Sequence, residues 1–511
     1  MKLSLDRTCI LINPPTALGL MYESEHLGLA HLMAVLIQQS WDVKLMDAYL
    51  EGLTIPEIVS RLEGESTPCF VGITVISRKA FASTLNIINW ICQAWPETRI
   101  ILGGYYATFW TDHVLNNAPD GVIVVRGEGE VTLQELSERI SMKKDWRDVR
   151  GISFCQDGKI HHLPARSLIA NLDTLPFPTR PTLDLLLKKG GYPSIYSSRG
   201  CYFQCSFCQV CQFYRKQPGL VYRARSPKNV LTEMLEVVTT SGQNHIGFVD
   251  DEFIGSGRKG VERVLDFCKE LDECSTRIIF GIQCRADSIE RDLFRNLKNV
   301  GLKHVYVGIE SASSRQLKLF NKHVAVAQNR RALAILEELG IEYNIGLILF
   351  DPYSQLDEIR ETSDFLRSIK GFPLGLNGLN ILPGTPIYNK VESDRLLDPM
   401  DEEGGYHFVN PVFIHFRRLV RAYASIYIPC VNRLRKLSGI LVTQIESSQI
   451  LQLRLQAGYQ RVRELHILFL DESARLLQLG KSTDGLMKEL GQEYSILSYE
   501  LNFIESEAKL Q

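Results

Sequence analysis

Two stretches of the chain alternate short apolar runs with segments of helical periodicity, and this alternation limits the fold more than any other feature. The first stretch covers residues 8 to about 140, and the second begins at Tyr192. Short apolar strands that alternate with helices indicate a parallel sheet covered by helices. The sequence therefore predicts an α/β protein whose ligands bind at the carboxyl ends of the strands.

The first stretch predicts a doubly wound, Rossmann-like domain. Its expected strands are Thr8–Asn13, Val43–Asp47, Phe70–Ile76, Arg99–Gly103 and Gly121–Val125. Its expected helices are Leu27–Gln39, Ala80–Ala94 and a closing helix from Glu130 onward. A hairpin is predicted over Gly151–Ile160, with its turn at Asp157-Gly158. The prolines of Leu175–Pro181 cannot continue a helix or a central strand, so this segment is predicted to be a linker.

The second stretch predicts six strand–helix units, which favour a partial (β/α)6 barrel with its active site at the carboxyl ends of the strands. The expected strands are Ser194–Ser197, His245–Asp250, Ile278–Arg285, His304–Gly308, Tyr343–Phe350 and Gly375–Leu382. The expected helices are Pro227–Thr239, Gly260–Leu271, Ile289–Val300, Ala325–Leu339 and Gln355–Ile369.

The last hundred residues change character, because no proline follows Pro429 and segments such as Ile450–Leu470 place apolar residues at helical spacing. They predict a mostly α-helical domain that packs onto the barrel and shapes the substrate pocket, in preference to a membrane-surface helix. The expected domain boundaries are 1–145, 146–190 for the hairpin and linker, 191–390 and 391–511.

Charge, hydropathy and cysteine content limit the classes of function. The 57 basic and 59 acidic residues nearly cancel, so nothing indicates nonspecific nucleic-acid binding. The sequence has neither a signal-peptide core at its start nor a run of about 18 apolar residues that could span a membrane. Twelve cysteines are too sparse for a disulfide framework and indicate a reducing cytoplasm. Eight of them are predicted to be ordinary packed thiols: Cys9, Cys69, Cys92, Cys155, Cys268, Cys274, Cys284 and Cys430.

Cys201, Cys205 and Cys208 have the spacing C-x3-C-x2-C. Three thiolates on one short loop can hold three irons of a [4Fe-4S] cube and leave the fourth iron open to a small molecule. A zinc site is one alternative, but it would need four ligands, and no second C-x2-C pair follows at the usual distance. A closed, ferredoxin-like cluster is the other, with Cys211 as its fourth ligand.

The cysteine spacing resembles the signature of the radical S-adenosylmethionine (SAM) superfamily. The resemblance implies that the open iron chelates the amino and carboxylate groups of SAM. It also implies that reduction, by a donor such as flavodoxin or ferredoxin, cleaves SAM to a 5′-deoxyadenosyl radical. Phe207, just before the last cysteine, is then expected to lie against the adenine of SAM.

The resemblance extends to the strand ends of the second stretch. It implies that Asp250 or Asp251 accepts hydrogen bonds from the SAM amino group, and that Glu310 binds the ribose or a neighbouring backbone group. Arg285, in a Q-x-R-A-D run, is expected to pair with the SAM carboxylate or a substrate acid. Gly384 lies in a Pro-Gly-Thr segment expected beside adenine. The alternatives are structural, namely a helix N-cap for the two aspartates and an internal ion pair for Arg285.

The strand ends of the first stretch resemble the cobalamin-binding domain that precedes many radical SAM domains, with its Gly-Gly turn and terminal Gly-Glu-Gly-Glu element. On this resemblance, cobalamin contacts are expected from Asn13, Pro14, Thr74, Gly103, Gly104, Gly127 and Glu128. The motif D-x-H-x-x-G does not occur, and His26, His31 and His113 are expected to be capping or core residues. Cobalamin is therefore expected without a histidine ligand; a relic domain that holds no corrinoid is the alternative.

Together these resemblances imply a cobalamin-dependent radical SAM C-methyltransferase that acts on a small metabolite, a lipid or a modified peptide. One SAM molecule would generate the radical and a second would remethylate the cobalamin. One alternative keeps the fold but catalyses a rearrangement or cyclisation without methyl transfer. The other is a non-catalytic corrinoid or iron–sulfur sensor, which the SAM-facing strand ends disfavour because a sensor needs no SAM pocket.

Overall fold

The computed structural model describes residues 7–15, 24–371, 373, 375–398, 405–443 and 449–510. Residues 1–6, on which the expectation about a signal peptide depends, lie outside the described residues. The chain divides into two compact units: Met1–Lys189 with Val210–Arg225, and Gly190–Gln209 with Ser226–Gln511.

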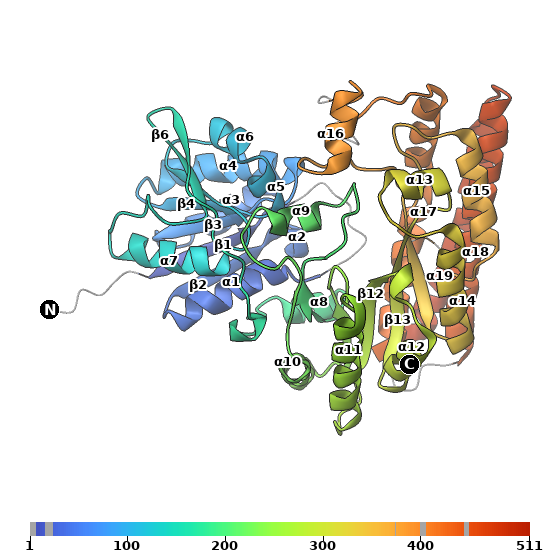
Figure 1. Ribbon diagram of the computed structural model, residues 1–511, viewed down its shortest axis with the longest axis horizontal. Helices are drawn as coiled ribbons and strands as arrows, with labels where there is room; N and C mark the ends of the chain where they lie inside the picture. Colours follow the sequence, from blue (N-terminus) through green and yellow to red (C-terminus); the bar gives the residue numbers. More distant parts are fainter. Residues whose placement is uncertain are drawn as a thin grey trace. The chain divides into compact units, whose positions relative to one another are not determined.

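The first unit contains a seven-stranded sheet in the order β2-β1-β3-β4-β5-β6-β7, whose strands appear in blue to teal in Figure 1. The strands are β1 (Thr8–Asn13), β2 (Asp42–Asp47), β3 (Phe70–Thr74), β4 (Arg99–Gly103), β5 (Val122–Val125), β6 (Ile152–Gln156) and β7 (Lys159–His162). Strands β1 to β5 are parallel, which confirms the predicted set.

Helices cover both faces of this sheet because successive residues of each strand point to opposite sides. Ile10 and Ile12 of β1 pack in one apolar core with α3 and α4, whereas Leu11 packs in another core with α1 and α7. The helices of the unit are α1 (Leu27–Gln38), α2 (Ala48–Glu51), α3 (Ile55–Glu63), α4 (Arg78–Ala94), α5 (Tyr105–Phe109), α6 (Thr111–Asn117), α7 (Glu130–Ser141) and α8 (Leu183–Lys188). A sheet buried on both faces explains why its strands are nearly continuous apolar runs.

The predicted hairpin is β6 and β7. Asp157 and Gly158 have φ of +52° and +71°, as a two-residue turn that matches the twist of the flanking strands requires. β6 also pairs antiparallel with β5, so the hairpin extends the sheet of the first unit, which the sequence did not predict.

The second unit contains a five-stranded parallel sheet in the order β14-β13-β12-β11-β8. The strands are β8 (Ser194–Ile195), β11 (His245–Phe248), β12 (Ile279–Arg285), β13 (Leu302–Glu310) and β14 (Glu342–Leu347). The predicted sixth strand over 375–382 is wrong, because described residues there form only isolated bridges such as Ile348 to Asn377. Pro373 has no N–H to donate, and the ring of Phe350 lies 2.2 Å from the position that a Cβ on Gly378 would take.

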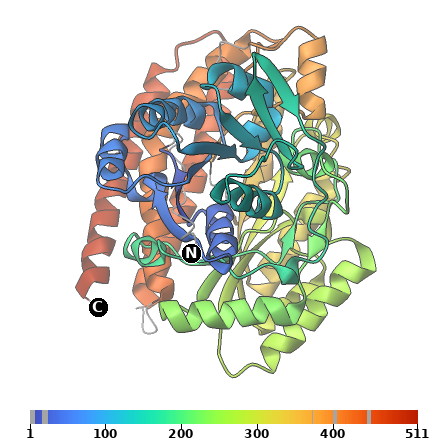
Figure 2. The ribbon, with the colours of Figure 1, turned by 90° about the vertical axis from the view of Figure 1, so that its left-hand side faces the viewer.

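Five helices of the second sheet begin close to their predicted starts: α10 (Pro227–Ser241), α11 (Gly257–Asp272), α12 (Arg291–Asn299), α14 (Val326–Leu339) and α15 (Leu356–Arg367). The structure adds α13 (Ser314–Leu319) and α16 (Pro386–Ser393), which the sequence did not predict. α10 and α11 lie side by side, in green in Figure 2.

The carboxyl-terminal region is helical, as predicted, and consists of α17 (Val412–Thr443), α18 (Gln449–Gln478) and α19 (Asp484–Leu510), in orange and red in Figure 1. It packs onto the barrel: the hydroxyl of Ser363 on α15 donates to Asp471 on α18 at 2.5 Å, and the hydroxyl of Tyr427 accepts the backbone N–H of Leu376 at 2.9 Å. No helix formed by the described residues has the length and apolar content of a membrane span.

Candidate active site

The three motif cysteines lie in the loop that follows the first strand of the second-unit sheet. β9 (Ser198–Arg199) leads to Gly200, whose φ of +81° turns the chain into the loop. Cys205 is buried, and Cys201 and Cys208 are half-buried. Burial is the main cause that raises the pKa of Cys201 to about 12, and Glu252, Cys208 and Cys205 act in the same direction, so the three thiols lie within electrostatic range of one another.

Hydrogen bonds hold the cysteine loop to the segment after α13. Ser206 donates its backbone N–H to the carbonyl of Phe320 at 2.9 Å and its hydroxyl to that of Leu319 at 2.7 Å. The amide of Asn321 donates to the carbonyl of Gln204 at 2.8 Å. The loop is therefore fixed on both sides of its second cysteine by residues more than a hundred positions away in the sequence.

The Pro-Gly-Thr segment lies against the same loop. Gln209 donates to the carbonyl of Pro383 at 2.9 Å, and the backbone N–H of Ile387 donates to Ser206 at 2.9 Å. Gly384 has φ of +77°, which favours glycine there. The structure thus brings together two motifs that the sequence predicted to share one site.

Two aromatic residues of the loop take different positions. Phe207, the residue predicted beside adenine, is half-buried and meets the ring of Phe320 edge to face at 5.4 Å. Phe203 lies under the guanidinium of Arg285, whose carbon is 3.6 Å from the ring centroid. This second contact was not predicted.

Asp250 and Asp251 follow β11 and both bind the strand that leads to the cysteine loop. The buried carboxylate of Asp250 accepts the backbone N–H of Ser197 at 2.9 Å and the hydroxyl of Ser197 at 2.7 Å. Asp251 accepts the backbone N–H of Gly200. Burial, with Asp250 as its neighbour, raises the pKa of Asp251 to about 7.

Arg285 ends β12 and is surrounded by protein acceptors. Its Nε and Nη2 donate to the two carboxylate oxygens of Asp287 at 2.8 and 3.0 Å, and Nη2 also donates to the carbonyl of Lys322 at 2.5 Å. Nη1 lies 3.4 Å from Sγ of Cys205. The carboxylate of Glu252 accepts the backbone N–H of Arg285 at 2.9 Å, and burial raises the pKa of Glu252 to about 7.

Glu310 ends β13 in an unusual backbone conformation. Its φ is +64°, and the pairing with β14 shifts register between Gly308 and Glu310. Nζ of Lys322, whose side chain is 3% exposed, donates to Glu310 at 2.9 Å. Non-glycine residues with positive φ cost free energy and concentrate at functional sites, so this strand end is a strained part of the site.

The donor set at the cysteine loop fits an iron–sulfur cube. Among the described residues, no three His, Cys, Asp or Glu side chains converge closely enough to share one metal ion. An iron–sulfur cube does not require three side chains to converge on one metal ion, because each thiolate binds a different iron. The nearby N–H donor of Arg285 suits sulfur ligands that carry negative charge. Cys211, the alternative fourth ligand, is buried on α9 (Gln209–Arg215) and belongs to the first unit.

Several predicted positions at the carboxyl edge of the first-unit sheet carry small uncharged residues, one of which binds a buried carboxyl group. Asn13 donates its amide to Asp47 at 2.7 Å, and burial raises the pKa of Asp47. Gly104 has φ of +97°, and a Cβ there would lie 2.9 Å from the carbonyl oxygen of Val75 and 3.1 Å from Oγ1 of Thr74. Only glycine fits this position, so the backbone of the predicted Gly-Gly turn is open to close approach. Of the other predicted residues of this edge, Pro14 is buried and Gly103 is half-buried.

Glu128 and Gly127 bind the segment Val210–Arg225, which returns to the first unit. The buried carboxylate of Glu128 accepts Nη1 of Arg223 at 2.8 and 2.9 Å and the backbone N–H of Ile169 at 2.9 Å. The side chain of Gln217 lies where a Cβ on Gly127 would stand. Both residues therefore have structural partners within the unit.

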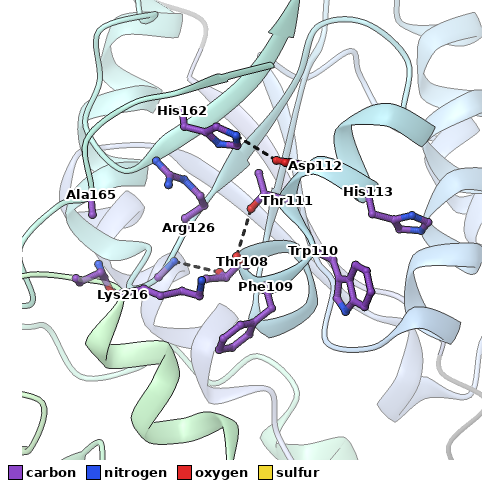
Figure 3. A pocket seen from close by; sticks show the side chains of 12 residues that line it. Thr108, Phe109, Trp110, Thr111, Asp112, His113, Arg126, His162, Ala165 and Lys216 are labelled. Atoms are coloured by element: carbon purple, nitrogen blue, oxygen red, sulfur yellow. Dashed lines mark hydrogen bonds and ion pairs between the residues drawn. The ribbon is translucent and has the colours of Figure 1, made fainter. Parts of the chain in front are cut away.

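A pocket of about 530 Å³ opens beside the end of β5 (Figure 3). Its lining includes Phe109, Trp110, Arg126 and Lys216, and His162 binds Asp112 at 3.1 Å across it. The carboxyl ends of β5 and β7 point the same way, because both pair antiparallel with β6. The pocket thus lies at the predicted ligand-binding edge.

The histidines that the sequence assigned to structural roles have such roles. His26 is the N-cap of α1, where its Nδ1 accepts the backbone N–H of Leu29 at 3.1 Å. His31 is buried, and His113 packs edge to face against Phe81 at 5.8 Å. The eight cysteines that the sequence predicted to be ordinary packed thiols are free and are buried or half-buried, as predicted.

Comparison with known protein families identifies both units. The family model of the B12 binding domain matches residues 19–137, and that of the radical SAM superfamily matches residues 195–366. The chain belongs to the B12-binding radical SAM enzymes. These domains give the enzyme its cofactors: cobalamin for the first, and SAM with a [4Fe-4S] cluster for the second.

Relatives with curated names support the assignment over most of the chain. An uncharacterized methyltransferase, PH0819, from Pyrococcus horikoshii is 27% identical over 413 residues, which are 79% of this chain and 87% of the relative. An anaerobic magnesium-protoporphyrin IX monomethyl ester cyclase from Rubrivivax gelatinosus is 32% identical over 64% of this chain. The match spans only 59% of that longer cyclase.

A solved structure has the same fold. The radical enzyme OxsB, with aqua-cobalamin and SAM bound, superimposes with a TM-score of 0.75 at 21% identity, and the match covers 98% of this chain and 80% of OxsB. At this identity the likeness concerns the fold alone.

Sequence reasoning missed several residues of the site. Glu252 was noticed only as one of three acidic residues, and Asp47 only as the end of a strand. Lys322 has no local signature, although it lies between two residues with positive φ, Asn321 at +51° and His323 at +54°. A buried lysine is rarely visible in a sequence, since burial depends on partners that are distant along the chain.

Proposed function

We propose that this radical SAM enzyme is a cobalamin-dependent C-methyltransferase that modifies an unactivated carbon of a small metabolite, a lipid or a modified peptide. One observation carries the proposal: the C-x3-C-x2-C loop lies at the carboxyl end of a parallel sheet, in a chain that also matches the B12-binding domain over residues 19–137. The similarity to a methyltransferase over most of the chain supports methyl transfer.

In this proposal Cys201, Cys205 and Cys208 hold the cluster. The bound cofactors supply a carbon radical and a transferable methyl group, and the protein supplies position and exclusion of water. Phe207 and Gly384 would bind the adenine side of SAM, since both belong to the segments joined at Ser206. Asp251 and Glu310 are the proposed acceptors for its polar groups.

Asp250 and Arg285 have protein partners for their side chains, so we propose that they act on SAM through the loop that they position. For cobalamin, the proposed contacts remain Asn13, Pro14, Thr74, Gly103 and Gly104, with Gly127 and Glu128 shaping the adjoining loop. The domain boundaries at 145, 190 and 390 remain proposals, as do a low-potential electron donor and a reducing cytoplasmic location.

The test needs no knowledge of the substrate. The anaerobically reconstituted protein, with and without cobalamin, is incubated with SAM and a strong reductant, and two products are measured. A methyltransferase releases S-adenosylhomocysteine only when cobalamin is present, and 5′-deoxyadenosine in both cases. Absence of S-adenosylhomocysteine from the cobalamin-loaded enzyme would refute methyl transfer.

The second candidate is a rearrangement or cyclisation without methyl transfer, which the similarity to the anaerobic cyclase favours. It predicts 5′-deoxyadenosine without S-adenosylhomocysteine in the same assay. A sensor would release neither product, so the three hypotheses give three different results.

A further inference from the structure

Arg285 is a charged side chain in direct contact with a motif cysteine. Its Nη1 lies 3.4 Å from Sγ of Cys205, a residue 80 positions away in the sequence. Both residues are buried, at 5% and 9% exposure. A hydrogen bond between them is therefore largely shielded from competing water, and such bonds are stronger than exposed ones.

The neighbours of Arg285 fix the direction of this contact. Asp287 accepts from Nε and Nη2, the carbonyl of Lys322 accepts from Nη2, and the ring of Phe203 lies under the guanidinium plane. A planar guanidinium held by a carboxylate along one edge cannot rotate its remaining nitrogen away without breaking two hydrogen bonds. The partners of Nε and Nη2 therefore hold Nη1 toward the sulfur of Cys205.

A second cation, Lys322, lies next to Arg285. Its carbonyl accepts Nη2 of Arg285 at 2.5 Å, and its Nζ donates to Glu310 at 2.9 Å. Asp287 accepts from Nε and Nη2 of Arg285, so the nitrogen that remains for the sulfur is Nη1. The positively charged guanidinium is thus in direct contact with the sulfur of Cys205.

We propose that Arg285 is a positioning residue of the iron–sulfur cluster: it holds Cys205 through an N–H···S hydrogen bond and favours the reduced form of the cluster. The proposal rests on the proposed cluster at Cys201, Cys205 and Cys208. Reduction takes one electron from a low-potential donor and adds one negative charge to the cluster without breaking a bond. A buried cation and an N–H donor therefore stabilise the reduced form more than the oxidised form.

The test compares two arginine variants of the full-length protein loaded with iron and sulfide. The midpoint potential is measured by titration with dithionite, followed through the electron paramagnetic resonance signal of the reduced cluster. We expect a more negative midpoint for Arg285→Met. Arg315→Met is the matched control, because the guanidinium of Arg315 is likewise bound by protein carboxylates, Asp351 at 2.6 Å and Glu358 at 2.7 Å. It should leave the midpoint unchanged.

An unchanged midpoint in an Arg285→Met protein that holds its full iron content overturns the proposal, and so does an equal shift in Arg315→Met. If the Arg285→Met protein binds no iron, a second experiment on the wild-type protein tests the proposal. It is labelled with guanidino-¹⁵N arginine, and pulsed paramagnetic resonance should detect ¹⁵N coupled to the reduced cluster. Absence of this coupling also overturns the proposal. A folded wild-type protein that binds no iron would instead refute the cluster assignment itself.

Discussion

The parallel strands of the two sheets follow the same strand–helix plan but present different chemistry at their carboxyl edges. In the second unit, buried charges crowd the edge: Asp250, Glu252, Arg285 and Lys322 are each at most 5% exposed. In the first unit, the predicted positions of the equivalent edge are mostly asparagine, threonine and glycine, with one buried carboxyl, Asp47, beside Asn13. Its buried ion pair, Glu128 with Arg223, binds the segment that returns to the unit.

The difference shows how one architecture serves two cofactors. A charged edge needs a partner for every charge, since an unpaired buried charge is costly, and the resulting network holds a reactive group in place. An edge of small neutral residues lets a large cofactor approach the backbone. Substitutions should therefore affect chemistry in the second unit, and stability or cobalamin affinity in the first.

Cys208→Ala should have the largest effect. It removes one of the three proposed cluster ligands, so formation of 5′-deoxyadenosine should fall to background while the first unit still binds cobalamin. Cys274→Ala is the control, since Cys274 is a half-buried thiol outside the motif and should be dispensable. SAM cleavage that survives in Cys208→Ala would contradict the cluster assignment.

Glu128→Gln should destabilise the first unit by about 3–5 kcal/mol, because it leaves the buried Arg223 unpaired. All five tryptophans (Trp41, Trp90, Trp95, Trp110 and Trp146) belong to the first unit, so tryptophan fluorescence during urea unfolding reports on it selectively.

The exposed pair Arg147–Asp145 provides the control, and Asp145→Asn should cost about 1 kcal/mol or less. If Glu128 instead contacts cobalamin directly and does not contribute to stability, Glu128→Gln will weaken cobalamin binding and leave the urea midpoint of unfolding unchanged.

Gly104→Ala should lower the free energy of unfolding more than Gly52→Ala does. The difference between the two values measures the effect of close packing separately from that of backbone conformation. Both glycines have positive φ, +97° and +76°, but a Cβ meets the carbonyl of Val75 at 2.9 Å in the first case and open space in the second. We expect about 1 kcal/mol for Gly52→Ala and roughly 1–3 kcal/mol more for Gly104→Ala, from the same unfolding measurement. Equal costs would mean that the turn relaxes freely.

The helical bundle offers a third, uncharged environment in which to test burial. His466 is fully buried beside the hydroxyl of Tyr423, and burial lowers its pKa to about 3. The unfolded chain binds a proton below about pH 6.5 and the folded chain does not, so stability is complete above that pH and is lost as the pH falls toward 3. As the pH falls from 7 to 5, the titration of this group should lower the free energy of unfolding of the wild type by about 2 kcal/mol.

His466→Asn should remove that loss, and the exposed His415→Asn should not. Helical circular dichroism during heating at the two pH values measures both variants. The same pH dependence in His466→Asn and the wild type would show that the buried site admits a proton.

Local patterns predicted most of the fold. The strands Thr8–Asn13 and Arg99–Gly103 have the expected bounds, and the hairpin turns at Asp157-Gly158. The predicted sixth strand was wrong because its residues form only isolated bridges such as Ile348 to Asn377, and pairing with a segment almost thirty positions earlier cannot be read from a local pattern. In the site, the cysteines were visible from their spacing, whereas the contact of Arg285 with Cys205 joins residues 80 positions apart.

The sequence by itself determined the chain of strands and helices, the cysteine loop after the first strand of the second sheet, and the glycines at the first-unit edge. These depend on periodicity, ligand spacing and backbone freedom, which are properties of neighbouring residues. Only the tertiary structure decided which partners the buried charges meet, as with Arg285 at Cys205 and Glu128 at Arg223. A buried charge is stable only beside its partner, and that partner comes from wherever the folded chain returns.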